Sequence, residues 1–181
     1  KEITNAIHNE TFRRSVREKT GIPLSPYFPA TKAAWLLQHN EHARELAQAG
    51  KLCIGTIDSW LVYKLTEGVV FKTDYSNASR TQIFNLHSLR WDTEICEVLG
   101  VPVDALPQVE SSDGDFGATT LSGFFDSPVP IRAVLGDSHA ALFGQGCVWP
   151  GMAKATYGTG SSIMMNIGPD FKQSQSGLVT S

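Results

Sequence analysis

The sequence predicts an α/β or α+β fold, because segments of helical and strand periodicity alternate along its 181 residues. The clearest local sign is the apolar run 129–135, which ends at Gly136-Asp137 and is followed by a helix of small residues. The composition agrees with a packed domain, since 41% of the residues are hydrophobic and the net charge is only −3. Such a chain can bury a core and does not resemble a disordered one.

The first part of the chain is predicted to be mainly helical. Apolar residues recur with helical spacing from Ile3 to Lys19, and Gly21 with Pro23 ends this helix. Two prolines make 25–29 irregular. Further helices are expected over 31–40, over 41–49 and from a cap at Thr56 or Asp58 to Leu65, with a short strand at 51–55. Trp35 and Trp60 lie on apolar helix faces and are expected in the core.

Strands become more frequent in the second part. A turn at 66–68 precedes an extended segment at 69–71, and 74–80 is polar and predicted to be irregular. A helix from Trp91 is closed by Gly100. Strands are expected over 81–86, 129–135, 152–157 and 162–167, with a surface connection at 104–128 and a helix at 138–145.

Charge and cysteine content exclude several classes of protein. A pI near 5.9 without a basic patch argues against nucleic acid as a partner, and no apolar run is long enough to span a bilayer. The acidic block 92–137 is expected to be solvated surface. Cys53, Cys96 and Cys147 follow no metal pattern and are expected to be reduced core thiols of a cytoplasmic protein. The chain has neither an initiator Met nor a signal peptide, and we expect it to be a piece of a longer protein.

Asp137 is the first candidate catalytic residue. It is predicted at the carboxyl end of a strand, where open α/β sheets bind ligands. The alternative is that Asp137 only caps the following helix through backbone N–H groups. A metal pair with His139 is disfavoured, because side chains two positions apart on a helix diverge, and we assign no metal ligand.

The second candidate is the turn Gly158-Thr159-Gly160, 22 residues after Asp137. Glycines on both sides of Thr159 allow positive φ and leave backbone N–H groups uncovered, which suits a phosphate. The alternative is a plain hairpin turn, since neither a Walker A sequence nor GxGxxG is present.

Five segments, in order along nearly the whole chain, resemble the FGGY family of carbohydrate kinases, and most closely its glycerol kinase branch. The first, 27–39, matches the family's signature in its Lys, Trp and polar end, although Ala33 replaces the usual larger apolar residue. The others are 55–61, 73–81, 136–145 and 151–160.

The resemblance implies two actin-like ATPase domains of ribonuclease H-like fold, separated by a cleft. Residues 1–147 would form the later part of the first, substrate-binding domain, and residues 148–181 the opening β-hairpin of the second, nucleotide-binding domain. The family's N-terminal phosphate loop and C-terminal adenosine site have no counterpart here, so the isolated chain is expected to be inactive.

The resemblance also implies an activity, the ATP-dependent phosphorylation of a hydroxyl of a small polyol or sugar. Asp137 would be the general base, Tyr27 would line the acceptor pocket, and Gly158, Thr159 and Gly160 would hold the terminal phosphates of ATP. The Mg²⁺ would be held mainly by the phosphates and by residues outside this chain. No nucleic acid or membrane partner is expected, and the full-length protein would be a homo-oligomer.

Two positions depart from the glycerol kinase pattern. Ser138 stands where a Gln is usual and Ser162 where a Phe is usual, and both shorter side chains would enlarge the substrate pocket and make it more polar. A ketose such as xylulose or ribulose is therefore an alternative acceptor. An alternative of another class is an actin-like switch driven by nucleotide without an acceptor, against which the Tyr27 segment and Asp137 argue. Asp74, Asn77 and Arg80 match the family and are expected to hold a loop together.

Overall fold

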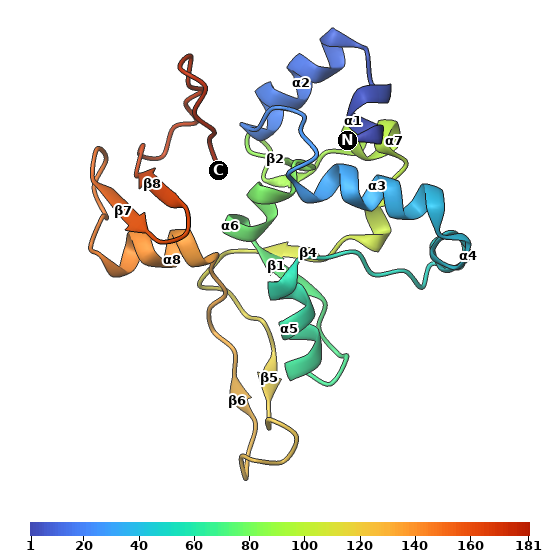
Figure 1. The fold of residues 1–181 in the computed structure, drawn as a ribbon. Helices are drawn as coiled ribbons and strands as arrows, with labels where there is room; N and C mark the ends of the chain where they lie inside the picture. Colours follow the sequence, from blue (N-terminus) through green and yellow to red (C-terminus); the bar gives the residue numbers. More distant parts are fainter.

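A computed structural model describes all 181 residues as a helix-rich body from which two β-hairpins project (Figure 1). The helices are α1 (Glu2–Ala6), α2 (Glu10–Thr20), α3 (Pro29–His39), α4 (Glu41–Gln48), α5 (Ile57–Leu65), α6 (Tyr75–Ala78), α7 (Thr93–Leu99) and α8 (Asp137–Gly144), with single 3₁₀ turns at Ser79–Thr81 and Val103–Ala105. The strands are β1 (Lys72–Asp74), β2 (Phe84–Asn85), β3 (Arg90–Trp91), β4 (Gln108–Glu110), β5 (Ala118–Thr119), β6 (Val129–Pro130), β7 (Ala153–Tyr157) and β8 (Ser161–Met165).

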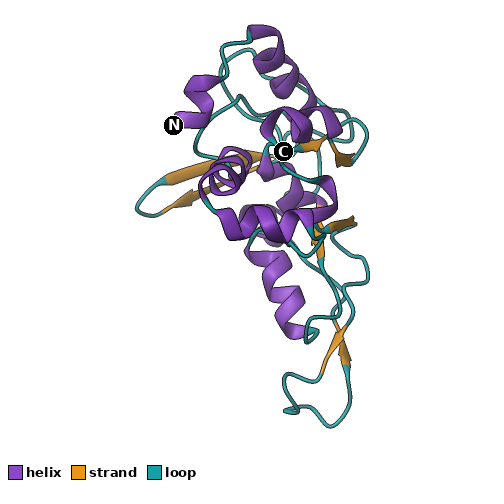
Figure 2. Cartoon of the chain, turned by 90° about the vertical axis from the view of Figure 1, so that its right-hand side faces the viewer, coloured by secondary structure: helices purple, strands orange, loops and turns teal.

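The strands form four two-stranded sheets. β1 and β4 are parallel, with Thr73 opposite Val109, whereas β2–β3, β5–β6 and β7–β8 are antiparallel pairs. Figure 2, turned by 90°, shows that the β5–β6 hairpin extends well away from the helices. The mixed α/β character that the sequence predicts is confirmed.

The hydrophobic core lies among the N-terminal helices and α7. Val16, Ala30, Ala34 and Ile95 are fully buried in a cluster that draws on α1, α2, α3 and α7. Apolar side chains at helical spacing on α2 and α3 meet there, and their removal from water stabilises this body.

The predicted helix from Ile3 to Lys19 is wrong in one respect, because it is two helices. The side chain of Asn9 accepts a 3.0 Å hydrogen bond from the Phe12 amide and caps α2. This local bond competes with continuation of α1. The predicted stop is confirmed, since Gly21 ends α2 in the left-handed conformation with φ 73°.

Strand prediction was less accurate than helix prediction. No strand forms at 51–55, where one bond, from the Ile54 amide to the Ala105 carbonyl at 2.7 Å, joins the segment to a neighbour. Of 129–135 only Val129–Pro130 is a strand, and of 81–86 only Phe84–Asn85. A strand requires regular pairing over its length, and beyond these residues the pairing is limited to isolated bonds, such as those of Ile131 with Phe116 and Gly117. The strand β4 lies within the predicted surface connection, and 74–80 is largely helical rather than irregular.

Both tryptophans placed in the core are instead at the surface. Trp60 is 57% exposed and Trp35 is 43% exposed. Trp35 stacks on His39 with ring centroids 4.4 Å apart, and its indole N–H donates to Glu2 at 3.0 Å. The prediction of core thiols is confirmed for Cys96 and Cys147, which are buried, and is wrong for Cys53, which is exposed. All three cysteines are free thiols.

The last part of the chain forms the β7–β8 hairpin and then returns to the N-terminal helices. Helix α8 packs against both strands of the hairpin. After β8, the Thr180 amide donates to the Gly21 carbonyl at 3.1 Å, and Arg17 donates to the Ser174 carbonyl at 2.8 Å. The tail is thus held beside α2. No helix in the structure combines the length and the apolar character that a membrane crossing requires.

Candidate functional site

A buried carboxylate organises the centre of the molecule. Asp74, at the end of β1, is fully buried and caps α6 by accepting from the Ser76 and Asn77 amides. It also accepts from the hydroxyls of Ser76 and Ser112, each at 2.6 Å. Burial alone would raise the pKa of Asp74, but the hydrogen bonds from Ser112, Ser76 and Asn77 together lower it. Asp74 is therefore a charged structural hub, as the prediction for this loop requires.

This hub fixes the residue that precedes the candidate base. The Gly136 amide donates to the Ser76 hydroxyl at 2.7 Å. A Cβ at position 136 would lie 3.3 Å from both that hydroxyl and the His139 ring nitrogen Nδ1, closer than most side chains tolerate. A larger residue here would have to displace its neighbours slightly, and the bond from Gly136 to Ser76 ties the start of α8 to α6.

Asp137 is the first residue of α8 and is exposed. The carboxylate of Asp137 accepts one hydrogen bond, from the amide of the next residue, Ser138, to its Oδ1 atom at 2.6 Å. Gly136, and not Asp137, occupies the N-cap position of α8, and the one backbone amide that Asp137 binds is that of Ser138. An ionised side chain in the first turn is favoured by the helix dipole and remains available to a ligand.

The turn Gly158-Thr159-Gly160 joins β7 to β8 and is exposed throughout. The amides of Thr159 and Gly160 donate to no protein acceptor, while the Gly158 amide donates to the Gly160 carbonyl at 3.2 Å. Neither glycine uses the positive φ that its lack of a side chain allows. The glycines instead leave the backbone bare, because a Cβ at Gly160 would meet nothing within 4 Å. Free amides and a hydroxyl at an open turn are suitable donors for a phosphate.

Tyr27 lies in the turn before α3, with its side chain 75% exposed. Its ring is edge-on to Phe28, with centroids 5.1 Å apart, and the guanidinium of Arg80 lies 5.2 Å from the Phe28 ring centroid. Lys32 donates to the Tyr27 carbonyl at 2.8 Å. The phenol hydroxyl makes no hydrogen bond, so it can serve a ligand.

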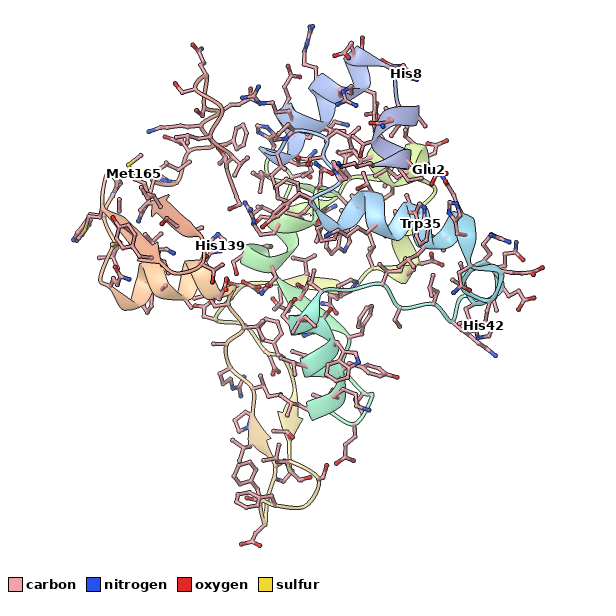
Figure 3. The ribbon with its side chains drawn as sticks, viewed as in Figure 1. Glu2, His8, Trp35, His42, His139 and Met165 are labelled. Carbon is pink, nitrogen blue, oxygen red and sulfur yellow. The ribbon has the colours of Figure 1, made fainter.

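His139, in the first turn of α8, lies near the end of the helix that faces α6 (Figure 3). Burial first, and then the positive charge of Arg80, lower its pKa, against opposing effects of Asp74 and Asp137. Its Nε2 atom is 3.5 Å from the Ser181 hydroxyl. A neutral imidazole is therefore favoured beside Asp137.

The predicted site residues lie on three separate elements. Asp137 and the half-buried Ser138 begin α8, whereas Ser162 is exposed on β8, opposite Thr156 in the hairpin. The packing of α8 on the hairpin joins these two groups. Tyr27 belongs to a third element, the turn before α3, and the charge of Arg80 interacts both with Tyr27 and with His139 of α8.

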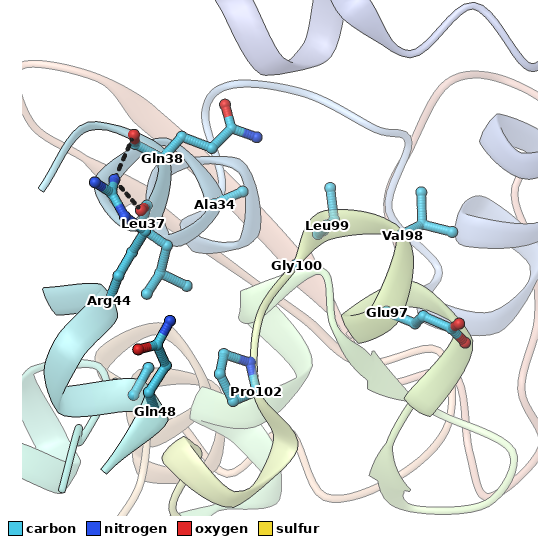
Figure 4. A pocket seen from close by; sticks show the side chains of 11 residues that line it. Ala34, Leu37, Gln38, Arg44, Gln48, Glu97, Val98, Leu99, Gly100 and Pro102 are labelled. Carbon is cyan, nitrogen blue, oxygen red and sulfur yellow. Dashed lines mark hydrogen bonds between the residues drawn. The ribbon is translucent and has the colours of Figure 1, made fainter. Parts of the chain in front are cut away.

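None of these residues lines either of two cavities elsewhere in the molecule. A cavity of about 670 Å³ lies between α3, α4 and α7 (Figure 4), and one of about 500 Å³ lies beside α1 and α3. In the first, Arg44 is already occupied, because it donates to the Leu37 carbonyl at 3.2 Å and the Gln38 carbonyl at 2.8 Å. The predicted site residues are therefore separate from both of these cavities.

Sequence reasoning assigned Asp74 and Asn77 to a structural loop but missed their partners Ser76 and Ser112 and the helix α6. Asp74 followed by Ser76 and Asn77 is a helix-capping pattern, which could have indicated α6. Ser112 gave no such signal, because it reaches Asp74 from 38 residues away. No group of three or more His, Cys, Asp or Glu side chains is placed to hold a metal ion, and we assign no residue of this chain to Mg²⁺.

Comparison with known proteins identifies what this geometry resembles. The model of the N-terminal domain of the FGGY family of carbohydrate kinases matches residues 1–144. A glycerol kinase of Xanthomonas euvesicatoria pv. vesicatoria is 49% identical over 180 residues, and that of Brevibacillus brevis is 49% identical over 179; each alignment covers 99% of this chain. The chain spans 36% of the length of these curated relatives.

Solved structures agree on the fold. The crystal structure of Plasmodium falciparum glycerol kinase with ADP superposes with a TM-score of 0.91 at 31% identity, covering 98% of this chain and 35% of that one. A gluconate kinase from Lactobacillus acidophilus gives a TM-score of 0.75 at 24% identity, covering 90% of this chain and 32% of that one, and supports the fold alone. The predicted actin-like fold is confirmed.

Proposed function

This chain belongs to the FGGY family of carbohydrate kinases, and from this we propose that it is the central part of an enzyme that transfers the terminal phosphoryl group of ATP to a hydroxyl of a small polyol or sugar. Residues 1–147 would form the later part of the acceptor-binding domain, and residues 148–181 would open the nucleotide-binding domain. The match of the family model to residues 1–144 supports the first of these boundaries.

The observation that carries this proposal is the state of Asp137. An exposed carboxylate that accepts only from the adjacent amide begins a helix packed on the hairpin that carries the bare turn at 158–160. Asp137 accepts the proton of the acceptor hydroxyl as that oxygen bonds to the γ-phosphorus of ATP and ADP leaves. A positioned base of this kind contributes about 10²–10⁴ in rate, and the remaining catalysis is positioning and charge stabilisation.

The other residues bind and orient. The hydroxyl of Thr159 and the unpaired amides of Thr159 and Gly160 donate to phosphate oxygens, while the phenol of Tyr27 donates to an acceptor oxygen. Mg²⁺ is a further requirement in this proposal, since it neutralises phosphate charge when bound. We expect its ligands to be the phosphates themselves and residues outside this chain.

The acceptor itself has two candidates. The high identity to curated glycerol kinases favours glycerol. The small side chains at Ser138 and Ser162 favour a longer acceptor such as xylulose or ribulose, because Ser162 is exposed and leaves space at the hairpin.

A coupled ADP-release assay of the full-length protein tests the proposal. Glycerol, xylulose, ribulose and a control without acceptor are compared at saturating ATP and Mg²⁺. We expect ADP release that depends on one of these acceptors. Equal ADP release with and without every acceptor would instead indicate a nucleotide-driven switch and would contradict the proposed kinase.

A further inference from the structure

Arg80 is a half-buried arginine whose charged group has no polar partner. The guanidinium carries five N–H donors. It nevertheless forms neither a hydrogen bond nor a salt bridge with another residue of the protein. Its one defined contact is the Phe28 ring, 5.2 Å from the guanidinium carbon. A cation–π contact of this kind does not use the N–H donors in hydrogen bonds to oxygen acceptors, so these donors remain available to a ligand.

The surroundings of Arg80 are the candidate acceptor site. Burial lowers the pKa of Arg80, and the nearby Tyr27 opposes this effect. The charge of Arg80 also lowers the pKa of His139 in the first turn of α8, whereas Asp137 raises it. The Phe28 ring contacts both Arg80 and Tyr27, so Arg80 lies in the neighbourhood of the phenol proposed to bind the acceptor, and its charge also acts on the helix that carries the proposed base.

The charges around this position are balanced. Arg80 and Lys32 are positive, and Lys32 is held at Tyr27 by its bond to the Tyr27 carbonyl and lies 6.0 Å from the ring. Asp74 and Asp137 are negative, and the half-buried His139 between them is favoured in its neutral form. The exposed carboxylate of Asp137 would repel an acceptor that carries a carboxylate of its own, and a neutral polyhydroxy acceptor avoids this repulsion.

We propose that Arg80 donates hydrogen bonds to hydroxyl oxygens of a neutral polyhydroxy acceptor and so determines acceptor affinity. This inference rests on the proposed kinase function and adds an acceptor-binding residue to it. A purely structural role would need only the stacking on Phe28, which Arg80→Lys preserves in part as a cation near a ring. The planar guanidinium of Arg80 can donate to two oxygens at once, and Arg80→Lys would lose this paired recognition.

The test is steady-state kinetics of the full-length protein with wild type, Arg80→Gln, Arg80→Lys and Arg14→Gln. Arg14 is an exposed arginine of α2 without side-chain partners and provides the matched control. We expect Arg80→Gln to raise the acceptor KM about 10-fold to 100-fold, the effect of losing charge-assisted hydrogen bonds. The KM for ATP and the thermal midpoint should stay unchanged, and Arg80→Lys should recover little of the loss.

Several outcomes would overturn the inference. An unchanged acceptor KM in Arg80→Gln, or an equal rise in the KM for ATP, would exclude acceptor recognition by Arg80. A carboxylate-bearing aldonate that outperforms every neutral acceptor would exclude the neutral class. If Arg80→Gln fails to fold, the acceptor KM of Arg80→Lys decides, and a value equal to that of wild type refutes the proposal. If the wild-type protein shows no acceptor-dependent ADP release, the proposed function itself is refuted. If the wild-type protein is active and Arg80→Gln has the same acceptor KM, only the role of Arg80 is refuted.

Discussion

The amide of Gly136 donates a 2.7 Å hydrogen bond to the hydroxyl of Ser76, a residue 60 positions earlier in the chain. The same hydroxyl donates to the buried carboxylate of Asp74 at 2.6 Å. Asp137 follows directly, so the backbone that carries the proposed base is fixed by a network anchored in β1 and α6. Catalysis at Asp137 should therefore depend on residues that never touch the substrate.

Ser76→Ala should lower kcat of the full-length enzyme about tenfold, because a base displaced by a fraction of an ångström loses its alignment with the acceptor. The lost hydrogen bonds should also lower the free energy of unfolding by about 1–2 kcal/mol. Steady-state kinetics measures kcat, and urea unfolding measures the free energy of unfolding. Ser88→Ala, at an exposed serine whose hydroxyl has no partner, should change neither. A kcat equal to that of wild type in Ser76→Ala would show that the network does not position Asp137.

Asp74 should make the stability of this chain sensitive to acid. Its pKa is lowered in the folded state from an ordinary value of 3.8, so the unfolded state binds the proton more readily. The stabilisation is complete above the unfolded pKa and is lost as pH falls through 3.8 toward the folded pKa. Asp74→Asn should reduce the free energy of unfolding by about 2–3 kcal/mol at pH 7.

The measurement is urea unfolding of wild type and Asp74→Asn at several pH values from 7 to 3. The difference between the two proteins should shrink as the pH falls below about 4. A difference that stays constant over this range would show that the charge of Asp74 contributes nothing.

Thr159→Val in the full-length enzyme should raise the KM for ATP about tenfold, because one hydrogen bond to a charged phosphate is lost. Valine keeps the shape and the strand-compatible branching, and the acceptor KM should remain within about twofold of wild type. Initial-rate kinetics with each substrate varied in turn distinguish the two constants. Equal rises in both would argue against a role of this hydroxyl in phosphate binding.

The three thiols should differ in reactivity. Burial raises the pKa of Cys96 to about 12, whereas Cys53 is exposed. Only the thiolate reacts with disulfide reagents, so at pH 8 Cys53 should be labelled rapidly and Cys96 only after unfolding. Mass spectrometry of peptides from timed labelling of the native chain gives the result. Rapid native labelling of Cys96 would show that its helix, α7, opens readily.

Local features of this molecule could be predicted from the sequence, and features that depend on distant partners could not. The stop of α2 at Gly21, the end of α7 at Gly100 and the β7–β8 hairpin follow from neighbouring residues, and each prediction is confirmed. The pairing of β1 with β4 and the bond from Ser112 to Asp74 join segments more than 30 residues apart, and no local pattern marks either one.

The same distinction applies to the candidate site. Gly136-Asp137 and the turn at 158–160 were recognisable as short motifs, and the structure leaves both accessible. The apolar face assigned to Trp60 was not decisive, because helical spacing shows that a face exists and not what covers it. Arg80 was placed in a structural loop by its sequence position, and only its missing polar partners in the folded chain suggest a ligand.

The account depends most on Asp137 as the base that receives the acceptor proton. The direct measurement is kcat of Asp137→Asn in the full-length enzyme at saturating ATP and acceptor, together with its thermal midpoint. We expect kcat to fall by about two orders of magnitude or more with an unchanged midpoint, since asparagine fills the same space and accepts no proton. Turnover near the wild-type rate in a folded Asp137→Asn would contradict the account.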